Sequence, residues 1–158
     1  MLDTAIFSWS ENFRIGHGRI DQDHRAILHH LRALQCRPHA PCDVKKTLST
    51  ALKLRELCRS HFAEEEGLMR DFTDPVALVH RDIHTMRHGA TMAHLDSVIA
   101  HLNGESEGID LFKIIDRLTE TLLMDITWLD FEMLTFTKVE LSDEPGVVVS
   151  FPKALTRS

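Results

Sequence analysis

Two pairs of side chains that can bind metal ions flank a helix break in the middle of the chain. His61 and Glu65 form the first pair, His80 and His84 form the second, and the partners in each pair are four residues apart. Between the pairs, Asp74-Pro75 suits a helix start, because Asp caps helix N-termini and Pro fits the first helical position. On two helices, each pair would project from a single face. The stretch therefore predicts a helical hairpin with a polar inner face.

The four side chains are also placed symmetrically about the break. His61 and His84 are equally far from residues 72–73, and so are Glu65 and His80. Residues equally far from the turn of an antiparallel hairpin lie side by side, so three imidazoles and a carboxylate would meet at one level. The alternative is an amphipathic hairpin with scattered histidines, since the chain has 11 of them. The matched positions favour a metal site.

Composition bounds the class of protein. The chain has 158 residues, is 43% hydrophobic and carries a net charge of −6. This length suits one domain, and the acidic balance predicts no attraction to nucleic acid or to an anionic membrane surface. There is no apolar run of about eighteen residues, so we expect no membrane span. The three cysteines follow no CxxC spacing and no secretory signal is visible, so a cytoplasmic location is expected.

Four segments show helical periodicity of apolar residues. We predict helices over about residues 21–35, 43–71, 75–102 and 109–139. Long amphipathic helices joined by short loops predict an all-α protein, an up-down-up-down four-helix bundle.

The two ends of the chain lack this periodicity. Residues 1–19 are expected to form an irregular arm that Trp9, Phe13 and Ile15 pin to the bundle, which makes residues 1–139 one domain. Residues 140–158 are expected to form a loose C-terminal tail.

Two more side chains are predicted to face the bundle interior. His24 lies on the apolar stripe of the first helix, and Glu132 is on an inward heptad position of the last, level with His80 about a turn near residue 106. A buried Glu costs several kcal/mol unless it is paired or bound to metal. The alternatives for Glu132 are a salt bridge with Arg81 or Arg87 and a slight rotation of the helix that exposes it. The alternative for His24 is a ring bonded to a backbone carbonyl.

Together these residues form a candidate ligand set. Its members are His24, His61, Glu65, His80, His84 and Glu132. Imidazoles with carboxylates suit iron, manganese or zinc. Six donors exceed the four that one structural zinc ion uses, whereas a two-metal centre with Glu65 spanning both ions uses them all. Asp125, inward on the last helix, is expected to support an inward histidine or Arg87, and His88 to support the site edge or be exposed.

The motif set resembles that of bacterial hemerythrins, over about residues 7–137. The matching residues are Trp9, Phe13, Ile15-Gly16, Ile20-Asp21, His24, the HFAEEE run from His61, Met69, Pro75, His80, His84 and Trp128-Leu129. The resemblance implies a four-helix bundle with two non-haem irons, joined by an oxo or hydroxo bridge, that binds O2 or a small anion such as azide. It implies His24 and His61 on one iron, His80 and His84 on the other with a fifth histidine, and Glu65 as a bridge.

The last motif departs from the family pattern. Family members resemble Trp-Leu-x-x-His with a bridging Asp five residues later, whereas this chain reads WLDFEMLTFT. Glu132 stands in place of the histidine and could bridge the irons or cap one of them. Thr137 stands in place of the aspartate and would lie beside the metals without binding them.

Three functions remain open at this point. The first is a non-enzymatic hemerythrin-like binder of O2 or another small ligand, for storage, delivery or sensing. The second is an oxidase, peroxidase or ferroxidase, because a carboxylate-rich centre resembles that of ferritin-like di-iron enzymes. The third is a sensor or interaction bundle with a degenerate site. The chain has no tyrosine, which excludes a tyrosyl radical beside the metals. The oligomeric state is left open.

Overall fold

The computed structural model describes residues 9, 11–34, 43–105 and 110–137 of the chain. Within these residues every regular element is helical, which confirms the predicted all-α bundle. The elements are a 3-10 turn η2 (Glu11–Phe13), α1 (Gly18–Leu34), α2 (Val44–Met69), α3 (Pro75–Leu102), α4 (Leu111–Met124), a π-helical turn η3 (Asp125–Leu129) and α5 (Asp130–Phe136). The expected tail, residues 140–158, lies outside the described residues.

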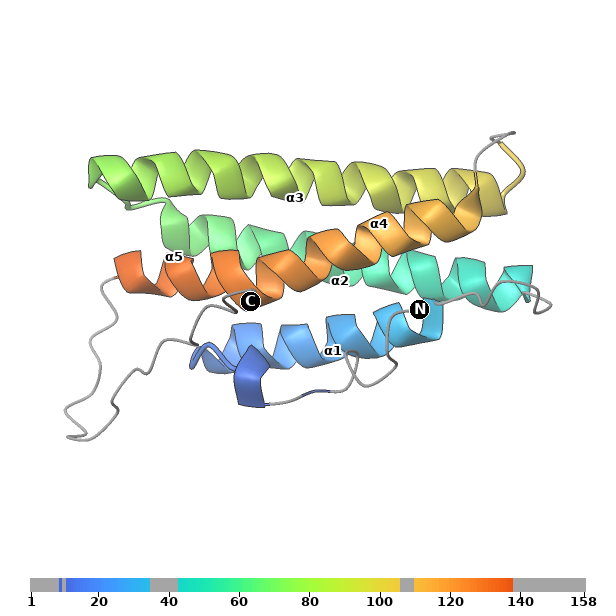
Figure 1. The fold of residues 1–158 in the computed structure, drawn as a ribbon, viewed down its shortest axis with the longest axis horizontal. Helices are drawn as coiled ribbons and strands as arrows, with labels where there is room; N and C mark the ends of the chain where they lie inside the picture. Colours follow the sequence, from blue (N-terminus) through green and yellow to red (C-terminus); the bar gives the residue numbers. More distant parts are fainter. Residues whose placement is uncertain (1–8, 10, 35–42, 106–109, 138–158) are drawn as a thin grey trace, which may run out of the picture.

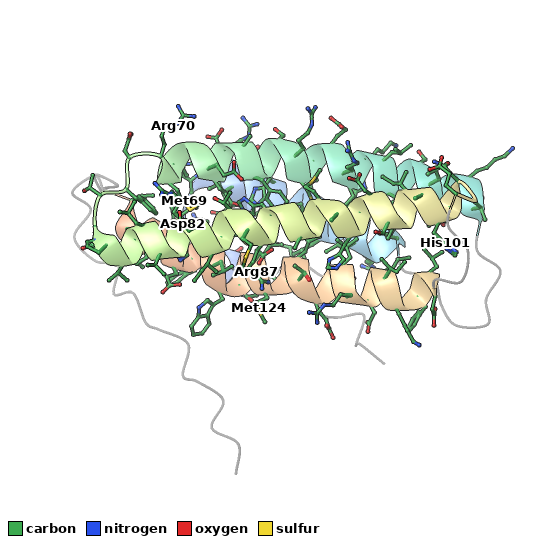
Figure 2. All side chains as sticks on the ribbon, turned by 90° about the horizontal axis from the view of Figure 1, so that it is seen from above. Met69, Arg70, Asp82, Arg87, His101 and Met124 are labelled. Carbon is green, nitrogen blue, oxygen red and sulfur yellow. The ribbon has the colours of Figure 1, made fainter. Side chains whose placement is uncertain are left out.

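The helices lie alongside one another along the long axis of the molecule (Figure 1). Each of α1, α2 and α3 packs against the next helix in the chain, and the colours of Figure 1 show that the chain direction alternates from helix to helix. The segments α4, η3 and α5 follow one continuous path and together form the fourth arm of the bundle. In Figure 2, α3 lies between α2 on one side and this fourth arm on the other.

Aspartates fix the N-termini of three helices. The Asp43 carboxylate accepts a hydrogen bond from the backbone N–H of Lys46, and the Asp110 carboxylate caps α4 in the same way. Asp74 accepts from the N–H groups of Val76 and Ala77 at 2.8 and 3.2 Å, with Pro75 as the first residue of α3. These caps satisfy N–H groups that have no partner within the helix. The predicted helix break at Asp74-Pro75 is thus confirmed.

The arm before α1 is tied to the bundle by one carboxylate and by apolar contacts. The carboxylate of Asp21 accepts hydrogen bonds from the backbone N–H groups of Ile15 and Gly16. Gly16 has φ +92°, a conformation that glycine adopts without strain. Trp9 and Phe13 pack against the main apolar cluster and Ile15 against a second one, as predicted.

The predicted single last helix is interrupted by the π turn. The backbone N–H of Asp130 donates to the carbonyl of Asp125, five residues earlier. This wider turn holds one residue more than an α turn, so every later side chain is rotated from its place in a continuous α-helix. Asp130 and Met133 therefore face inward, 1% and 0% exposed, whereas the Glu132 side chain is 46% exposed. The predicted inward position of Glu132 is wrong for this reason.

None of the described helices is long and apolar enough to cross a lipid bilayer.

Packing in the larger apolar cluster should dominate the stability of the bundle. Leu118 in α4 is 0% exposed and belongs to this cluster. We expect Leu118→Ala to lower the free energy of unfolding by about 2–5 kcal/mol, because it removes buried methyl groups and leaves a cavity. Urea denaturation monitored by circular dichroism measures this. The control is Leu52→Ala, at a side chain that is 46% exposed, for which a change within about 0.5 kcal/mol is expected. Equal losses in both variants would contradict the assignment of the core.

Candidate metal centre

A polar layer crosses the interior of the bundle between two apolar clusters. The smaller cluster contains Ile20, Met69, Phe72, Ala77 and Met133, and the larger one includes Ile27, Cys58, Leu95, Leu122 and Ile126. Along α1, His24 lies between Ile20 and Ile27, and each of the other arms likewise presents its polar residues between members of the two clusters. The apolar residues on both sides keep this polar layer away from bulk water.

Four side chains form the first group of possible metal ligands. They are His24 of α1, His61 and Glu65 of α2 and Asp130 of α5, and one donor atom from each lies within 4.8 Å of the others. The Nε2 of His24 is 2.9 Å from Oδ2 of Asp130, and the Nε2 of His61 is 3.3 Å from Oε1 of Glu65. All four side chains are buried. Three different segments of the chain thus converge on one point.

A second group lies next to the first and shares Glu65 with it. It consists of Glu65, His84 and His88. The Nε2 of His88 is 3.1 Å and that of His84 is 3.8 Å from Oε2 of Glu65. Asp130 also reaches this group, since its Oδ1 is 3.0 Å from Nε2 of His84 while its Oδ2 contacts His24. Two carboxylates, Glu65 and Asp130, therefore span two pairs of imidazoles.

Many inward-facing atoms of this layer have no hydrogen-bond partner. Among the described residues these include both carboxylate oxygens of Glu65, Oδ1 of Asp130 and Nε2 of His84 and of His88. Close contacts such as that between His84 and Asp130 are not aligned for hydrogen bonding. A buried polar group without a partner costs about 1–3 kcal/mol, and coordination to a cation would remove that cost. The donors therefore fit metal ions.

The two central carboxylates have opposite tendencies to ionise. Burial, reinforced by the charge of Asp130, raises the pKa of Glu65 well above its ordinary value. Burial acts on Asp130 in the same direction, but its interactions with His24 and His84 outweigh burial and hold the pKa of Asp130 below its ordinary value. In the absence of metal, a proton in this pair is therefore held more readily by Glu65 than by Asp130. A cation between the two carboxylates would favour release of that proton.

Two histidines of α3 are held in the neutral form that binds metals. Burial, together with the nearby His84, lowers the pKa of His88 to about 3. The pKa of His80 is lowered for the same two reasons. A neutral imidazole has a free lone pair on one ring nitrogen, and this is the form that coordinates metal ions.

Outer carboxylates orient these same two rings. Oε1 of Glu66 lies 3.0 Å from Nδ1 of His88, and Oε2 of Glu132 lies 3.2 Å from Nδ1 of His80. A carboxylate that accepts the proton of Nδ1 fixes the tautomer and leaves Nε2 free to bind metal. Glu132, predicted as a ligand, joins neither group found among the described residues and is placed to orient His80 from outside them.

Other carboxylates support the layer from further out. Oδ2 of Asp23 lies 3.8 Å from Nδ1 of His61, and its interaction with His61 lowers the pKa of Asp23. The guanidinium of Arg87 donates to Oδ1 of Asp125 at 2.6 Å, which confirms the predicted pairing of these two residues. Figure 2 shows Arg87 between α3 and α4. Burial nevertheless raises the pKa of Asp125.

The structure brings together most, though not all, of the predicted ligands. His24, His61, Glu65 and His84 lie in the two groups, while His80 joins neither of those found among the described residues. Symmetry about the turn had paired Glu65 with His80, but Glu65 contacts His84 and His88. Helical side chains tilt toward the N-terminus, which is away from the turn in α2 and toward it in α3. Glu65 therefore meets α3 residues one to two turns further from the turn than symmetry predicts.

Two further residues, His88 and Asp130, differ from the sequence-based expectation, whereas Thr137 was expected not to bind metal. His88, expected to be supporting or exposed, is 3% exposed and lies in the second group. Thr137 ends α5, and its hydroxyl donates to the carbonyl of Leu134, so it is a helix-end residue that joins neither group. Asp130 was missed, because it faces inward only as a result of the π turn. The one signal for it in the sequence is a carboxylate placed between Leu129 and Phe131, within an apolar stretch.

Taken together, the buried groups contain four imidazoles and two carboxylates that could hold metal ions. This donor set suits iron, manganese or zinc, and it exceeds what one structural zinc ion uses. Comparison of the chain with protein-family models, with curated proteins and with solved structures gives no match.

Proposed function

We propose that this protein is a hemerythrin-like binder of two iron ions that takes up O2 or another small ligand for storage, delivery or sensing. The observation that carries the proposal is the pair of adjacent ligand groups sharing Glu65 in the interior of the bundle. Two groups, each with two imidazoles and access to both carboxylates, match what a two-metal centre requires.

Each residue has a defined task in this proposal. His24 and His61 would hold one metal ion, His84 and His88 the other, and the carboxylates of Glu65 and Asp130 would span both. Two anionic carboxylates partly neutralise the cations, and the neutral histidines add no charge. Iron held by these residues would supply exchangeable coordination sites and a change of oxidation state for a small ligand.

The surroundings favour binding of a small ligand over exchange with water. Phe62 is 4% exposed, and its ring stacks on that of His88 at 4.0 Å between centroids. Leu122 and Ile126 are each 1% exposed and close the layer on the side of the larger apolar cluster. Such an apolar enclosure restricts water and strengthens electrostatic interactions inside it. The chain thus offers a dry site of the kind that reversible O2 binding needs.

Two residues replace missing parts of the hemerythrin pattern, although His80 joins neither ligand group of the described residues. Asp130 supplies the second spanning carboxylate that Thr137 cannot supply, and His88 supplies an imidazole that Glu132 does not. A degenerate site would be expected to lose donors without replacement. The presence of replacements therefore favours a working metal centre over a scaffold without one.

Azide binding tests the proposal directly. Protein loaded with iron and oxidised should develop an azide-dependent absorption band in the visible or near-ultraviolet range, because the anion binds to ferric iron inside the bundle. Absorption titration measures the effect, and the metal-free protein is the blank. His61→Ala should weaken or abolish the band, since it removes one imidazole of the first group.

Two other outcomes would count against this function. An iron-loaded protein that shows no absorption change with azide or with O2 would contradict small-ligand binding. Continuous turnover of Fe2+ or peroxide, faster than in His61→Ala, would favour the oxidase, peroxidase or ferroxidase alternative.

A further inference from the structure

A groove on the bundle surface lies directly outside the second ligand group. It has a volume of about 410 Å3 and runs between α2 and α3. Its rim is formed by Arg59, Ala63 and Glu66 from α2 and by Thr85, Gly89 and Met92 from α3. Its remaining lining residues are Phe62 and His88, whose rings stack at 4.0 Å with an angle of 9° between their planes.

His88 separates this groove from the buried carboxylates. Its ring lines the groove, while its Nε2 lies 3.1 Å from Oε2 of Glu65. On the outer side, its Nδ1 lies 3.0 Å from Oε1 of Glu66, whose side chain is 44% exposed. Glu66, His88 and Glu65 thus form a continuous row of side chains that can bind metal, leading from solvent to the centre. A buried centre of this kind needs such a path, because ions cannot cross its apolar walls.

The charges at the groove select the kind of ion. Arg59 donates to Glu56 at 2.7 Å, so its positive charge is offset by a carboxylate on its own helix. Glu66 leaves a carboxylate at the rim, and carboxylates bind divalent cations in preference to anions.

We propose that this groove is the entry route for divalent cations into the metal centre, with Glu66 as the group that captures the cation at the rim. The cation passes from Glu66 to His88 and then to Glu65, each of which presents a donor atom to it in turn. This proposal rests on the two-metal centre proposed above, and it adds a loading path and a residue outside that centre.

One substitution should block the groove and leave the metal ligands intact. A Cβ at Gly89 would meet no atom within 4 Å, so the backbone there has room for a side chain, and Gly89→Leu adds an apolar side chain to the lining of the groove. The substitution also favours helix formation by up to about 1 kcal/mol, so folding should not suffer. Gly67→Leu is the matched control, because Gly67 is an exposed α2 glycine with the same open surroundings and does not line the groove.

A second pair of variants tests the charge of Glu66. Glu66→Gln removes the charge but keeps an oxygen that can accept the proton of His88. Its matched control is Glu132→Gln, since Glu132 makes the same contact with His80 and does not line this groove.

The rate of Co2+ uptake by metal-free protein, followed by stopped-flow absorption, is the measurement. We expect Gly89→Leu and Glu66→Gln to load roughly tenfold more slowly than the wild type, with unchanged cobalt per chain at the end point. Gly67→Leu and Glu132→Gln should load at the wild-type rate. Added salt should slow loading of the wild type more than that of Glu66→Gln, because salt screens the charge of Glu66, which the variant lacks.

The possible results separate this proposal from the proposed function. Gly89→Leu and Glu66→Gln loading at the wild-type rate would overturn the entry route and leave the metal centre standing. Glu66→Gln that loads at the wild-type rate but holds less cobalt would overturn capture by Glu66, which would then only orient His88. A wild type that takes up no cobalt would overturn the metal centre and the entry route together.

Discussion

Asp130→Asn should cost this protein metal, whereas Glu132→Gln should not. Asp130 is 1% exposed and contacts both His24 and His84, so removing its charge takes away a ligand that spans both groups. We expect the metal content to fall from two ions per chain to one or none. Among the described residues, the Glu132 carboxylate contacts the outer nitrogen of His80, and His80 joins neither ligand group, so the charge of Glu132 is not needed to hold either ion. At saturating metal, Glu132→Gln should thus still hold two ions.

Metal content per chain by mass spectrometry, on both variants and the wild type prepared in parallel, measures this difference. Both substitutions are nearly isosteric, and circular dichroism checks that each variant is folded. The reverse result, with metal lost from Glu132→Gln and kept by Asp130→Asn, would contradict the register that the π turn imposes. It would restore Glu132 as the metal ligand predicted from the sequence.

Removal of metal should lower the stability of the whole bundle. The centre joins α1, α2, α3 and α5, and its donor atoms lack hydrogen-bond partners without a cation. A ligand present at 100 times its Kd stabilises the folded state by about 2.7 kcal/mol. For a domain of this size, that corresponds to a rise in Tm of roughly 5–10 °C. Thermal unfolding with excess Fe2+ under anaerobic conditions, compared with chelator, measures the effect.

Glu65→Gln is the informative control for this experiment. The metal-free protein should unfold at nearly the same temperature with either residue, because burial and Asp130 already favour a neutral Glu65. Added Fe2+ should then stabilise the wild type much more than the variant, which lacks the shared carboxylate. A wild type whose Tm is the same in Fe2+ and in chelator would count against a metal centre in the folded protein.

The hairpin of α2 and α3 shows how far local sequence reasoning reaches. Asp74-Pro75 predicts the helix start, because the cap and the fixed φ of proline act within a few residues. The four-residue spacing of His61 and Glu65 places both on one helix face for the same reason. The exact partners across the hairpin were predicted less well, since symmetry about the turn ignores the tilt of side chains toward the helix N-terminus.

Glu132 shows a second limit of local sequence reasoning. Glu132 was predicted to lie level with His80 along the bundle, and its carboxylate lies 3.2 Å from Nδ1 of His80. The sequence did not decide which face of the helix carries Glu132. In the structure its half-exposed carboxylate contacts the outer nitrogen of the His80 ring. The level of a residue along the bundle follows from counting residues. The side of the helix on which it lies depends on the geometry of every turn that precedes it.

The sequence by itself determined the all-α fold, the helix starts at Asp43 and Asp74, and the presence of His24, His61, Glu65 and His84 in the interior. These depend on periodicity and capping, which act over one or two turns. Only the tertiary structure decided that Asp130 and His88 complete the two groups. The π turn at Asp125–Leu129 forgoes regular α-helical bonding, and it turns Asp130 toward His24, which is 106 residues away in the chain. A contact of that range leaves no local periodic signal, because the energy that favours it comes from the other helices.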